Sequence, residues 1–282
     1  MGEILGAYNV KLITYPNNSI QLRRYSVPMV TEPENPYEKD VEYNPFDFQK
    51  VKDIPWLEPF PEPKKKGGSS QVENEQRSFN RTKQKVFEYA RCVNWEWFVT
   101  FTFAPDKIDR YDFSECSKVI RKWLNNQRRN APELKYLVVP ERHKDGAYHF
   151  HGLLADVGAI KFTDSGHVTK NKEPIYNMPK WANGFTTATK VTNIHSVSKY
   201  VGKYITKDLC CLTKGLQRYF VSSNLPKPEI STFLVDSDTD FEDLLQTIAD
   251  SFGVDVVSLS TPRHEGAFVD VDYYELQERE TT

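Results

Sequence analysis

The chain has 282 residues, of which 13% are aromatic and 27% charged, enough for one substantial domain with appendages or for two small domains. It has no apolar run of about 18 residues and does not begin with a basic segment followed by a long apolar one, so we expect neither a transmembrane helix nor a signal peptide. None of its four cysteines forms a C-x-x-C pair, which argues against a structural zinc site and against a secreted disulfide scaffold. We therefore expect a cytoplasmic protein.

Charge is distributed unevenly along the chain. Residues 232–282 hold 13 Asp/Glu against 2 Lys/Arg, a net charge of −11, which leaves +9 for residues 1–231 of a chain whose total is −2. Residues 160–219 alone carry 10 Lys/Arg against 3 Asp/Glu. A basic region of this kind can attract a polyanion such as DNA, although lysines that only solvate a surface would give the same count.

The N-terminal part predicts a β-hairpin followed by irregular chain. Two β-rich runs, Tyr8–Tyr15 and Ser19–Tyr25, flank the turn residues Pro16, Asn17 and Asn18. Prolines and acids dominate residues 31–63, and residues 63–70 have the composition of a flexible linker. We expect a polar helix over residues 73–92.

The central part alternates strands and helices. Its expected strands cover residues 95–103, 136–141, 148–155, 184–192 and 218–222, and its expected helices cover residues 112–129 and 194–207. Residues 161–179 are polar and have the character of an irregular insertion. This order predicts an α+β fold: a two-layer sandwich with a central antiparallel sheet and helices on one face.

The expected domain division has three parts: residues 1–70, a core over residues 71–231, and an acidic C-terminal tail over residues 232–282. In the tail, apolar residues at helical spacing predict an amphipathic helix that packs on its own domain or docks on a partner: Phe241, Leu244, Leu245, Ile248 and Phe252.

A candidate metal site lies in the segment around His149-Phe150-His151. Residues two apart on a strand share a face, so the two imidazoles are neighbours. A three-residue turn, Lys144-Asp145-Gly146, with the glycine in the left-handed conformation, would pair Glu141 with His149 across the hairpin. Glu141, His149 and His151 would then converge, whereas a two-residue turn would place Glu141 on the wrong face. His143, at the turn, we expect to be a bystander.

A candidate nucleophile helix follows, with a tandem Y-x-x-K pattern. Tyr200 and Tyr204 are four residues apart and would share one helical face, each with a lysine three residues later, Lys203 and Lys207. A tyrosine hydroxyl needs a nearby cation to act as a nucleophile, because its pKa is near 10. Taken alone, this segment would equally suit an ordinary apolar helix stripe.

The ordered set of a Phe98–Phe103 strand, the His149-Phe150-His151 pair after Glu141, and the tyrosine helix resembles the HUH endonuclease superfamily. The paired tyrosines are similar to those of microvirus gene A proteins and related phage and plasmid replication (Rep) initiators. The resemblance covers roughly residues 95–228. No P-loop sequence follows, so unwinding would need another protein.

The resemblance implies a rolling-circle replication initiator that nicks one DNA strand. A divalent metal, Mg²⁺ or Mn²⁺, would be held by Glu141, His149 and His151, and a tyrosine would form a 5′-phosphotyrosine link and free a 3′ hydroxyl. Single-stranded DNA and origin DNA would be the substrates, and a host helicase and polymerase in the bacterial cytoplasm would be the partners. Candidate origin contacts are the 161–179 insertion, Arg121, Lys122, Arg128 and Arg129.

Three other functions fit parts of the pattern. A transposase of the same superfamily would use the same chemistry on hairpin ends, although paired tyrosines favour replication. A non-catalytic DNA-binding regulator could use the same scaffold, and a nicking assay would distinguish it. A structural metal module would bind no DNA. Salt-dependent DNA binding would therefore exclude this function.

Overall fold

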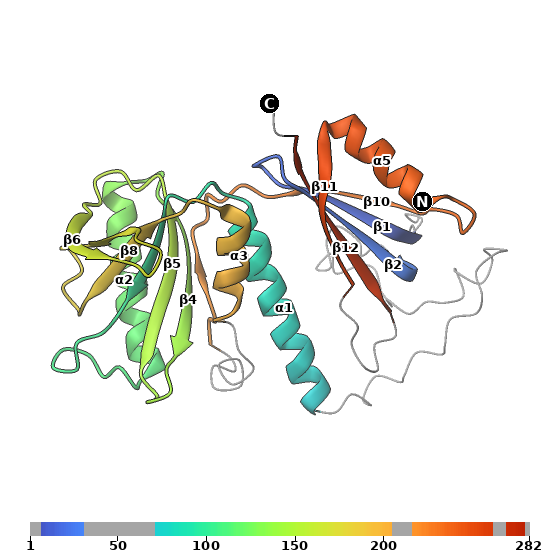
Figure 1. The fold of residues 1–282 in the computed structure, drawn as a ribbon. Coiled ribbons are helices and arrows are strands. Elements are labelled where there is room, and N and C mark those ends of the chain that lie inside the picture. The colour runs from blue at the N-terminus through green and yellow to red at the C-terminus, as the bar shows by residue number, and fades with distance from the viewer. Residues whose placement is uncertain (1–6, 31–70, 205–215, 262–268, 280–282) are drawn as a thin grey trace. The chain divides into compact units, whose positions relative to one another are not determined.

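The computed structural model describes residues 7–30, 71–204, 216–261 and 269–279. The chain divides into two compact units (Figure 1). One comprises residues 69–227, and the other combines the N-terminal segment with the C-terminal segment that starts at Pro228. Within the described ranges, no helix is long and apolar enough to cross a membrane.

The unit that joins the two ends of the chain is a five-stranded antiparallel sheet with one helix. The strand order is β10-β1-β2-β12-β11. The strands are β1 (Ala7–Thr14), β2 (Ile20–Val30), β10 (Glu229–Phe233), β11 (Val254–Ser260) and β12 (Val271–Glu278). Helix α5 (Phe241–Phe252) connects β10 to β11.

Helix α5 confirms the predicted amphipathic helix of the acidic segment. The Asp240 side chain caps its first turn by accepting hydrogen bonds from two backbone amides, and Gly253 ends it in the left-handed conformation. Its buried residues Phe241 and Ala249 join strand residues in one apolar core: Val10, Leu12, Ile20, Leu22, Val254 and Leu276. The helix therefore packs on its own domain.

The two terminal segments, which the sequence analysis divided between residues 1–70 and 232–282, form this sheet together. Strand β12 pairs with β2, and β10 pairs with β1, so the C-terminal segment flanks the N-terminal hairpin on both sides. The core combines apolar residues between Val10 and Leu22 with others between Phe241 and Leu276, and the two groups are more than 200 positions apart in the sequence. Pairing over such a separation leaves no local pattern.

The other unit contains a seven-stranded sheet with the order β6-β7-β8-β3-β5-β4-β9, in which neighbouring strands pair antiparallel. Its strands are β3 (Trp97–Phe101), β4 (Lys135–Arg142), β5 (Tyr148–Ala155), β6 (Thr163–Val168), β7 (Pro174–Asn177), β8 (Thr186–Lys190) and β9 (Phe220–Val221). The α+β class and the antiparallel sheet predicted from the sequence are confirmed.

One face of this sheet is covered by helix α2 (Phe113–Asn130), which starts after the N-cap Asp112. Trp123 of α2 packs edge-on against Phe101 of β3 and against Trp181. The buried side chains of α2 recur at helical spacing, as the sequence predicted. Sheet and α2 form the layers of the expected two-layer sandwich.

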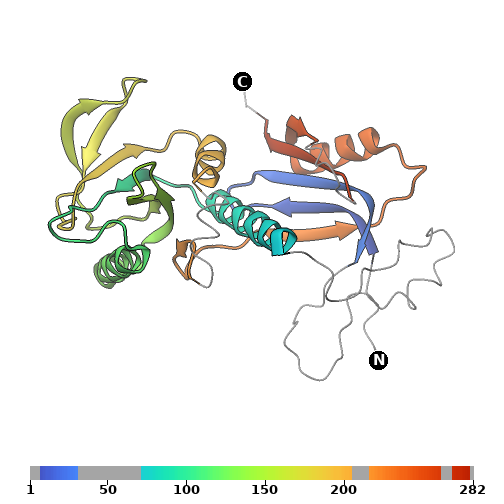
Figure 2. The ribbon, with the colours of Figure 1, turned by 90° about the horizontal axis from the view of Figure 1, so that it is seen from below.

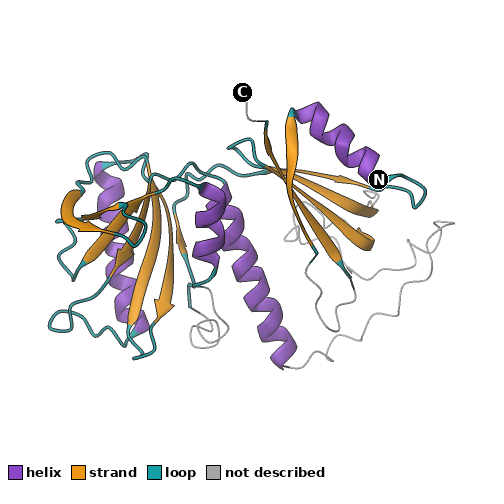
Figure 3. Cartoon of the chain, in the orientation of Figure 1, coloured by secondary structure: helices purple, strands orange, loops and turns teal. Residues whose placement is uncertain are grey.

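The opposite face carries helix α3 (Ile194–Gly202), which Figures 1 and 3 show beside the long helix α1 (Gln71–Arg91). Tyr200 of α3 packs against Phe98 of β3. The next residue, Val99, is buried and points to the other face of the strand, the face that α2 covers. The sheet thus has a helix on each face, beyond the single helical layer expected. Apolar periodicity shows which side of a helix is buried, but not which face of a sheet it covers.

The insertion over residues 161–179 is more regular than expected. It forms the β6–β7 hairpin, which extends the sheet beyond β8 and which Figure 2 shows as the yellow-green arm on the side away from α2. Its polar, largely exposed residues give no alternation of apolar side chains, because neither face of the arm is buried in a core.

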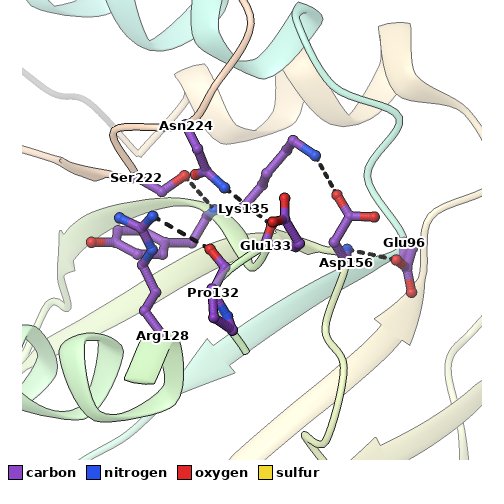
Figure 4. Close-up of polar contacts among 9 residues, drawn as sticks. Glu96, Arg128, Pro132, Glu133, Lys135, Asp156, Ser222 and Asn224 are labelled. Atoms are coloured by element: carbon purple, nitrogen blue, oxygen red, sulfur yellow. Dashed lines mark hydrogen bonds and ion pairs between the residues drawn. The ribbon is translucent and has the colours of Figure 1, made fainter. Parts of the chain in front are cut away.

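At the other edge of the sheet, polar contacts fix the segment after β9 (Figure 4). The Asn224 amide donates to the Glu133 carbonyl, and the Ser222 hydroxyl accepts from the Tyr136 amide. Lys135 forms an ion pair with Asp156, the residue that follows β5. The ion pair joins β4 to the end of β5, the two strands of the candidate site, at the end remote from that site.

Candidate metal and tyrosine site

The hairpin that carries the candidate metal ligands has the predicted register. Glu141 pairs with His149, and Val139 pairs with His151. The turn is closed by hydrogen bonds between His143 and Ala147 and from the Gly146 amide to the His143 carbonyl, with Gly146 at φ +92°. Because the turn has three residues and a left-handed glycine, Glu141, His149 and His151 are on one face of the sheet.

Glu141 and His151 are in direct contact. The His151 Nε2 atom lies 2.7 Å from Glu141 Oε2, and His151 Nδ1 lies 3.1 Å from the Thr100 hydroxyl on β3. This hydrogen bond to His151 holds the pKa of the Glu141 carboxyl below its usual range. The buried imidazole is therefore oriented from both of its nitrogens.

His149 lies slightly apart from that pair and packs against His143. The two ring centroids are 3.8 Å apart. Burial of the ring, together with the nearby His143 and His151, lowers the pKa of His149 to about 4. His149 is consequently a neutral imidazole at physiological pH, the form in which a ring nitrogen can bind a metal.

His143 is the residue that the sequence analysis missed. Its Nε2 atom lies 3.3 Å from Glu141 Oε2, so it belongs to the cluster and is not a bystander at the turn. The signal was present in the sequence, because His143 is two residues from Glu141 and therefore shares its face of the strand. The cluster comprises one carboxylate and three imidazoles.

The four side chains are close together but are not arranged as ligands. Across the described part of the chain, no group of three or more His, Cys, Asp or Glu side chains has the geometry to hold a metal ion. The donor types fit a divalent ion, since carboxylate and imidazole together suit Mn²⁺ and its transition-metal neighbours. The Thr100 hydroxyl on His151 is the kind of outer contact that orients a ligating histidine.

Helix α3 brings both tyrosines to this cluster. Asn193 caps the helix by accepting a hydrogen bond from the Ser196 amide, and the helix ends at Gly202. The expected helix over residues 194–207 is thus shorter, and Tyr204 lies in the following turn, where its amide bonds to the Val201 carbonyl. The tighter turn still keeps the rings of Tyr200 and Tyr204 in edge-on contact, with centroids 5.3 Å apart.

An aromatic stack joins the tyrosines to the histidines. The Tyr204 ring lies on the His151 ring, Phe98 lies against the same imidazole with centroids 5.7 Å apart, and Tyr200 meets Phe98 edge-on. The side chains that the sequence placed in separate motifs therefore form one site on one face of the sheet.

The two tyrosines have different environments. Tyr200 is 43% exposed, whereas Tyr204 is half-buried. Burial raises the pKa of Tyr204, and a hydrogen bond with Tyr200 and the charge of Glu141 raise it further. Tyr204 is therefore held as a phenol, and Tyr200 is the more accessible hydroxyl.

Of the two lysines predicted to assist the tyrosines, the structure describes Lys203. It is exposed, and its ammonium group lies 5.5 Å from the centre of the Tyr200 ring. Lys207 lies outside the described residues. The four arginines and lysines proposed as origin contacts are on α2, which covers the face opposite to the tyrosines, and Arg121 and Arg128 bond there to Gln217 and Ser223.

Comparison with known proteins gives a family match, and it lies in this region. Searches of curated proteins and of solved structures found no significant match. Residues 96–209, which include β3, the histidine hairpin and both tyrosines but less than half of the chain, match the family described as replication-associated protein ORF2/G2P.

Proposed function

We propose that this protein initiates rolling-circle DNA replication by nicking one DNA strand with a tyrosine nucleophile. The observation that carries the proposal is the stack of Tyr204, His151 and Phe98 with Tyr200 at its outer side, which puts two tyrosine hydroxyls beside a carboxylate–imidazole cluster. The replication-associated family that matches residues 96–209 supports the same function.

Each side chain has a definite task in this chemistry. Glu141, His149 and His151 would hold a divalent cation, Mg²⁺ or Mn²⁺, which supplies Lewis-acid stabilisation of charge on the phosphate when it is bound. Thr100 orients His151 through Nδ1. Lys203, whose ammonium group lies 5.5 Å from the centre of the Tyr200 ring, would offset negative charge that grows on the phosphoryl group.

The reaction is a transesterification. The tyrosine hydroxyl loses its proton and its oxygen forms a bond to phosphorus, while the bond between phosphorus and the 3′ oxygen breaks. The 3′ oxygen takes up a proton, so the products are a 5′-phosphotyrosine link and a free 3′ hydroxyl that can prime synthesis. The attack of a 3′ hydroxyl on the phosphotyrosine reverses these steps and rejoins the strand.

The test is covalent capture of DNA. The full-length protein is incubated with a single-stranded DNA pool of random sequence and Mn²⁺ or Mg²⁺, and protein–DNA adducts are isolated under denaturing conditions. We expect adducts attached to the 5′ end of the DNA, none with EDTA, and none from the Tyr200→Phe/Tyr204→Phe double variant.

A wild-type protein that forms no adduct would overturn the nicking proposal. If that protein still bound DNA in a salt-dependent manner, the result would favour a non-catalytic DNA-binding regulator on the same scaffold. Adducts formed only on hairpin ends would instead favour a transposase. No described residue favours either alternative over the replication initiator.

A further inference from the structure

A groove of about 640 Å³ lies beside Tyr200, in the unit that carries the tyrosines. Its walls are the turn between β6 and β7, strand β8, and the first turn of α3. Figure 2 shows the β6–β7 arm on the same side of the sheet as α3. A groove of this volume is of the size that holds a small organic group.

The groove is continuous with the tyrosine site. Tyr200 and Phe98 are among its lining residues, and Phe98 also lies against His151. Thr187, another lining residue, is the cross-strand partner of Thr100, the residue that contacts His151. A ligand in the groove would therefore lie beside Tyr200, and a single strand, β3, would separate β8 from the strand that carries His149 and His151.

The lining matches an unpaired nucleotide. The Thr187 and Thr189 hydroxyls on β8 and the Asn171 amide on the turn can donate to and accept from the edge of a base. The rings of Phe98 and Tyr200 offer surfaces for stacking.

The charges at the groove favour a polyanion. Lys170 and Lys190 line it, against a single carboxylate, Glu173, among the lining residues described. The Lys190 ammonium already lies over the Trp97 ring at 3.8 Å, so Lys170 is the cation that the groove offers to a phosphate. Lys170 is exposed at the turn and can follow a DNA backbone at the rim.

We propose that this groove binds the base of the nucleotide adjacent to the scissile phosphate and sets the sequence preference of the nick. This inference rests on the proposed nicking function. A base in a duplex is paired and stacked, and its edge cannot enter a groove walled by a strand, a turn and a helix; the groove therefore selects single-stranded DNA. The β6–β7 turn contributes to base recognition through Asn171 and contacts the phosphate backbone through Lys170.

The experiment sequences the DNA captured in covalent adducts from the random single-stranded pool. The test variant is Asn171→Ala/Thr189→Val, which removes two base-reading groups and keeps Tyr200 and the histidines. We expect the wild type to select a base at a position next to the cut, and the variant to lower that preference about tenfold at that position while other positions keep theirs.

Two variants that each remove one lysine distinguish binding in the groove from general attraction of DNA to positive charge. Lys170→Ala removes a lysine from the groove, and Lys161→Ala removes an exposed lysine from the same insertion outside it. We expect Lys170→Ala to weaken binding of fluorescent single-stranded DNA more than Lys161→Ala, as measured by anisotropy. Thermal unfolding of each variant identifies any loss of fold.

The outcomes are distinguishable from failure of the proposed function. If the wild type forms adducts but the Asn171→Ala/Thr189→Val variant keeps the same base preference, the groove inference is wrong and the nicking function stands. If the wild type forms no adduct, the nicking function fails, and the anisotropy comparison alone decides the groove: equal binding by Lys170→Ala and Lys161→Ala would overturn it.

Discussion

The Tyr204 ring lies flat on the His151 imidazole, with ring centroids 3.7 Å apart and ring planes inclined by 11°. The two tyrosines therefore have different environments, and we expect them to have different roles. Tyr204 is held over the cluster, with its pKa raised mainly by burial, whereas Tyr200 is exposed and hydrogen-bonded to Tyr204. The hydrogen bond with Tyr200 raises the pKa of Tyr204 further, so Tyr204 stays a phenol and Tyr200 is the more accessible hydroxyl.

Tyr200 is accordingly the first nucleophile in our prediction. The Tyr200→Phe variant should lose at least about a thousandfold of the initial nicking rate, as expected when a nucleophile is removed. Tyr204→Phe keeps the nucleophile and loses one hydrogen bond to a developing charge, which corresponds to a loss of about 10–100-fold. Single-turnover adduct formation by each variant measures both effects. Equal losses in the two variants, or a larger loss in Tyr204→Phe, would contradict this order.

Thr100 should determine how well the cluster binds metal. Thr100→Val keeps the side-chain shape but removes the hydroxyl that lies 3.1 Å from His151 Nδ1. Loss of such an outer contact is expected to weaken metal affinity about 10–100-fold. Calorimetric titration with Mn²⁺ measures the effect, and Thr187→Val, its cross-strand neighbour, is the control. Unchanged Mn²⁺ affinity in Thr100→Val would exclude the orienting role.

Gly184 is required for the close approach of two chain segments near β3. A Cβ atom at this position would lie 2.2 Å from the Thr102 carbonyl oxygen and 2.9 Å from the Ala104 amide nitrogen. Both are backbone atoms, so Gly184→Ala should lower the free energy of unfolding by about 3 kcal/mol or more. Urea denaturation checks this, with Gly202→Ala as the control, since a Cβ there meets no atom within 4 Å. Similar stability of the two variants would show that the Gly184 segment shifts freely.

The sequence predicted the hairpin register because local rules determine it. A left-handed glycine at position 146 and a three-residue turn leave one pairing that puts Glu141 opposite His149, and the structure has that pairing. The same alternation places His143 on the shared face. Local geometry was thus sufficient for the ligand strand, and the omission of His143 came from treating a turn residue as outside the pattern.

The pairing of segments that are far apart in the chain was harder to predict from the sequence. The β6–β7 arm and the groove beside it depend on polar residues whose pairing is set by backbone hydrogen bonds, so no apolar periodicity marks them. The union of the N- and C-terminal segments depends on pairings such as that of Ile20 with Leu276, both in the apolar core, which a local pattern cannot encode. Side-chain orientation at the cluster, where His149 turns to His143, also follows from packing alone.

The buried thiol of Cys116 on α2 gives a pH-dependent prediction. Burial raises the pKa of Cys116 to about 12, and nearby acidic side chains, the first of them Glu115, raise it further. At about pH 8 the folded protein should therefore resist alkylation at this position, because the thiolate is the reactive form. In the unfolded chain the thiol has an ordinary pKa near 9 and ionises first as pH rises. The Cys116 contribution to stability is thus fully present below about pH 9 and declines as pH rises towards 12.

The measurement of this thiol uses iodoacetamide labelling of a Cys210→Ser/Cys211→Ser variant, followed by mass spectrometry of the peptides that contain Cys116 and Cys92. Cys92 is also buried, and its pKa is raised to about 11, so both peptides should stay unlabelled in native buffer and become labelled in urea. Cys116 is fully enclosed between α2 and the sheet, at 0% exposure, and labelling requires that this layer opens. Rapid labelling of Cys116 in native buffer would show that α2 separates from the sheet without global unfolding, contrary to the packing of Trp123 on Phe101.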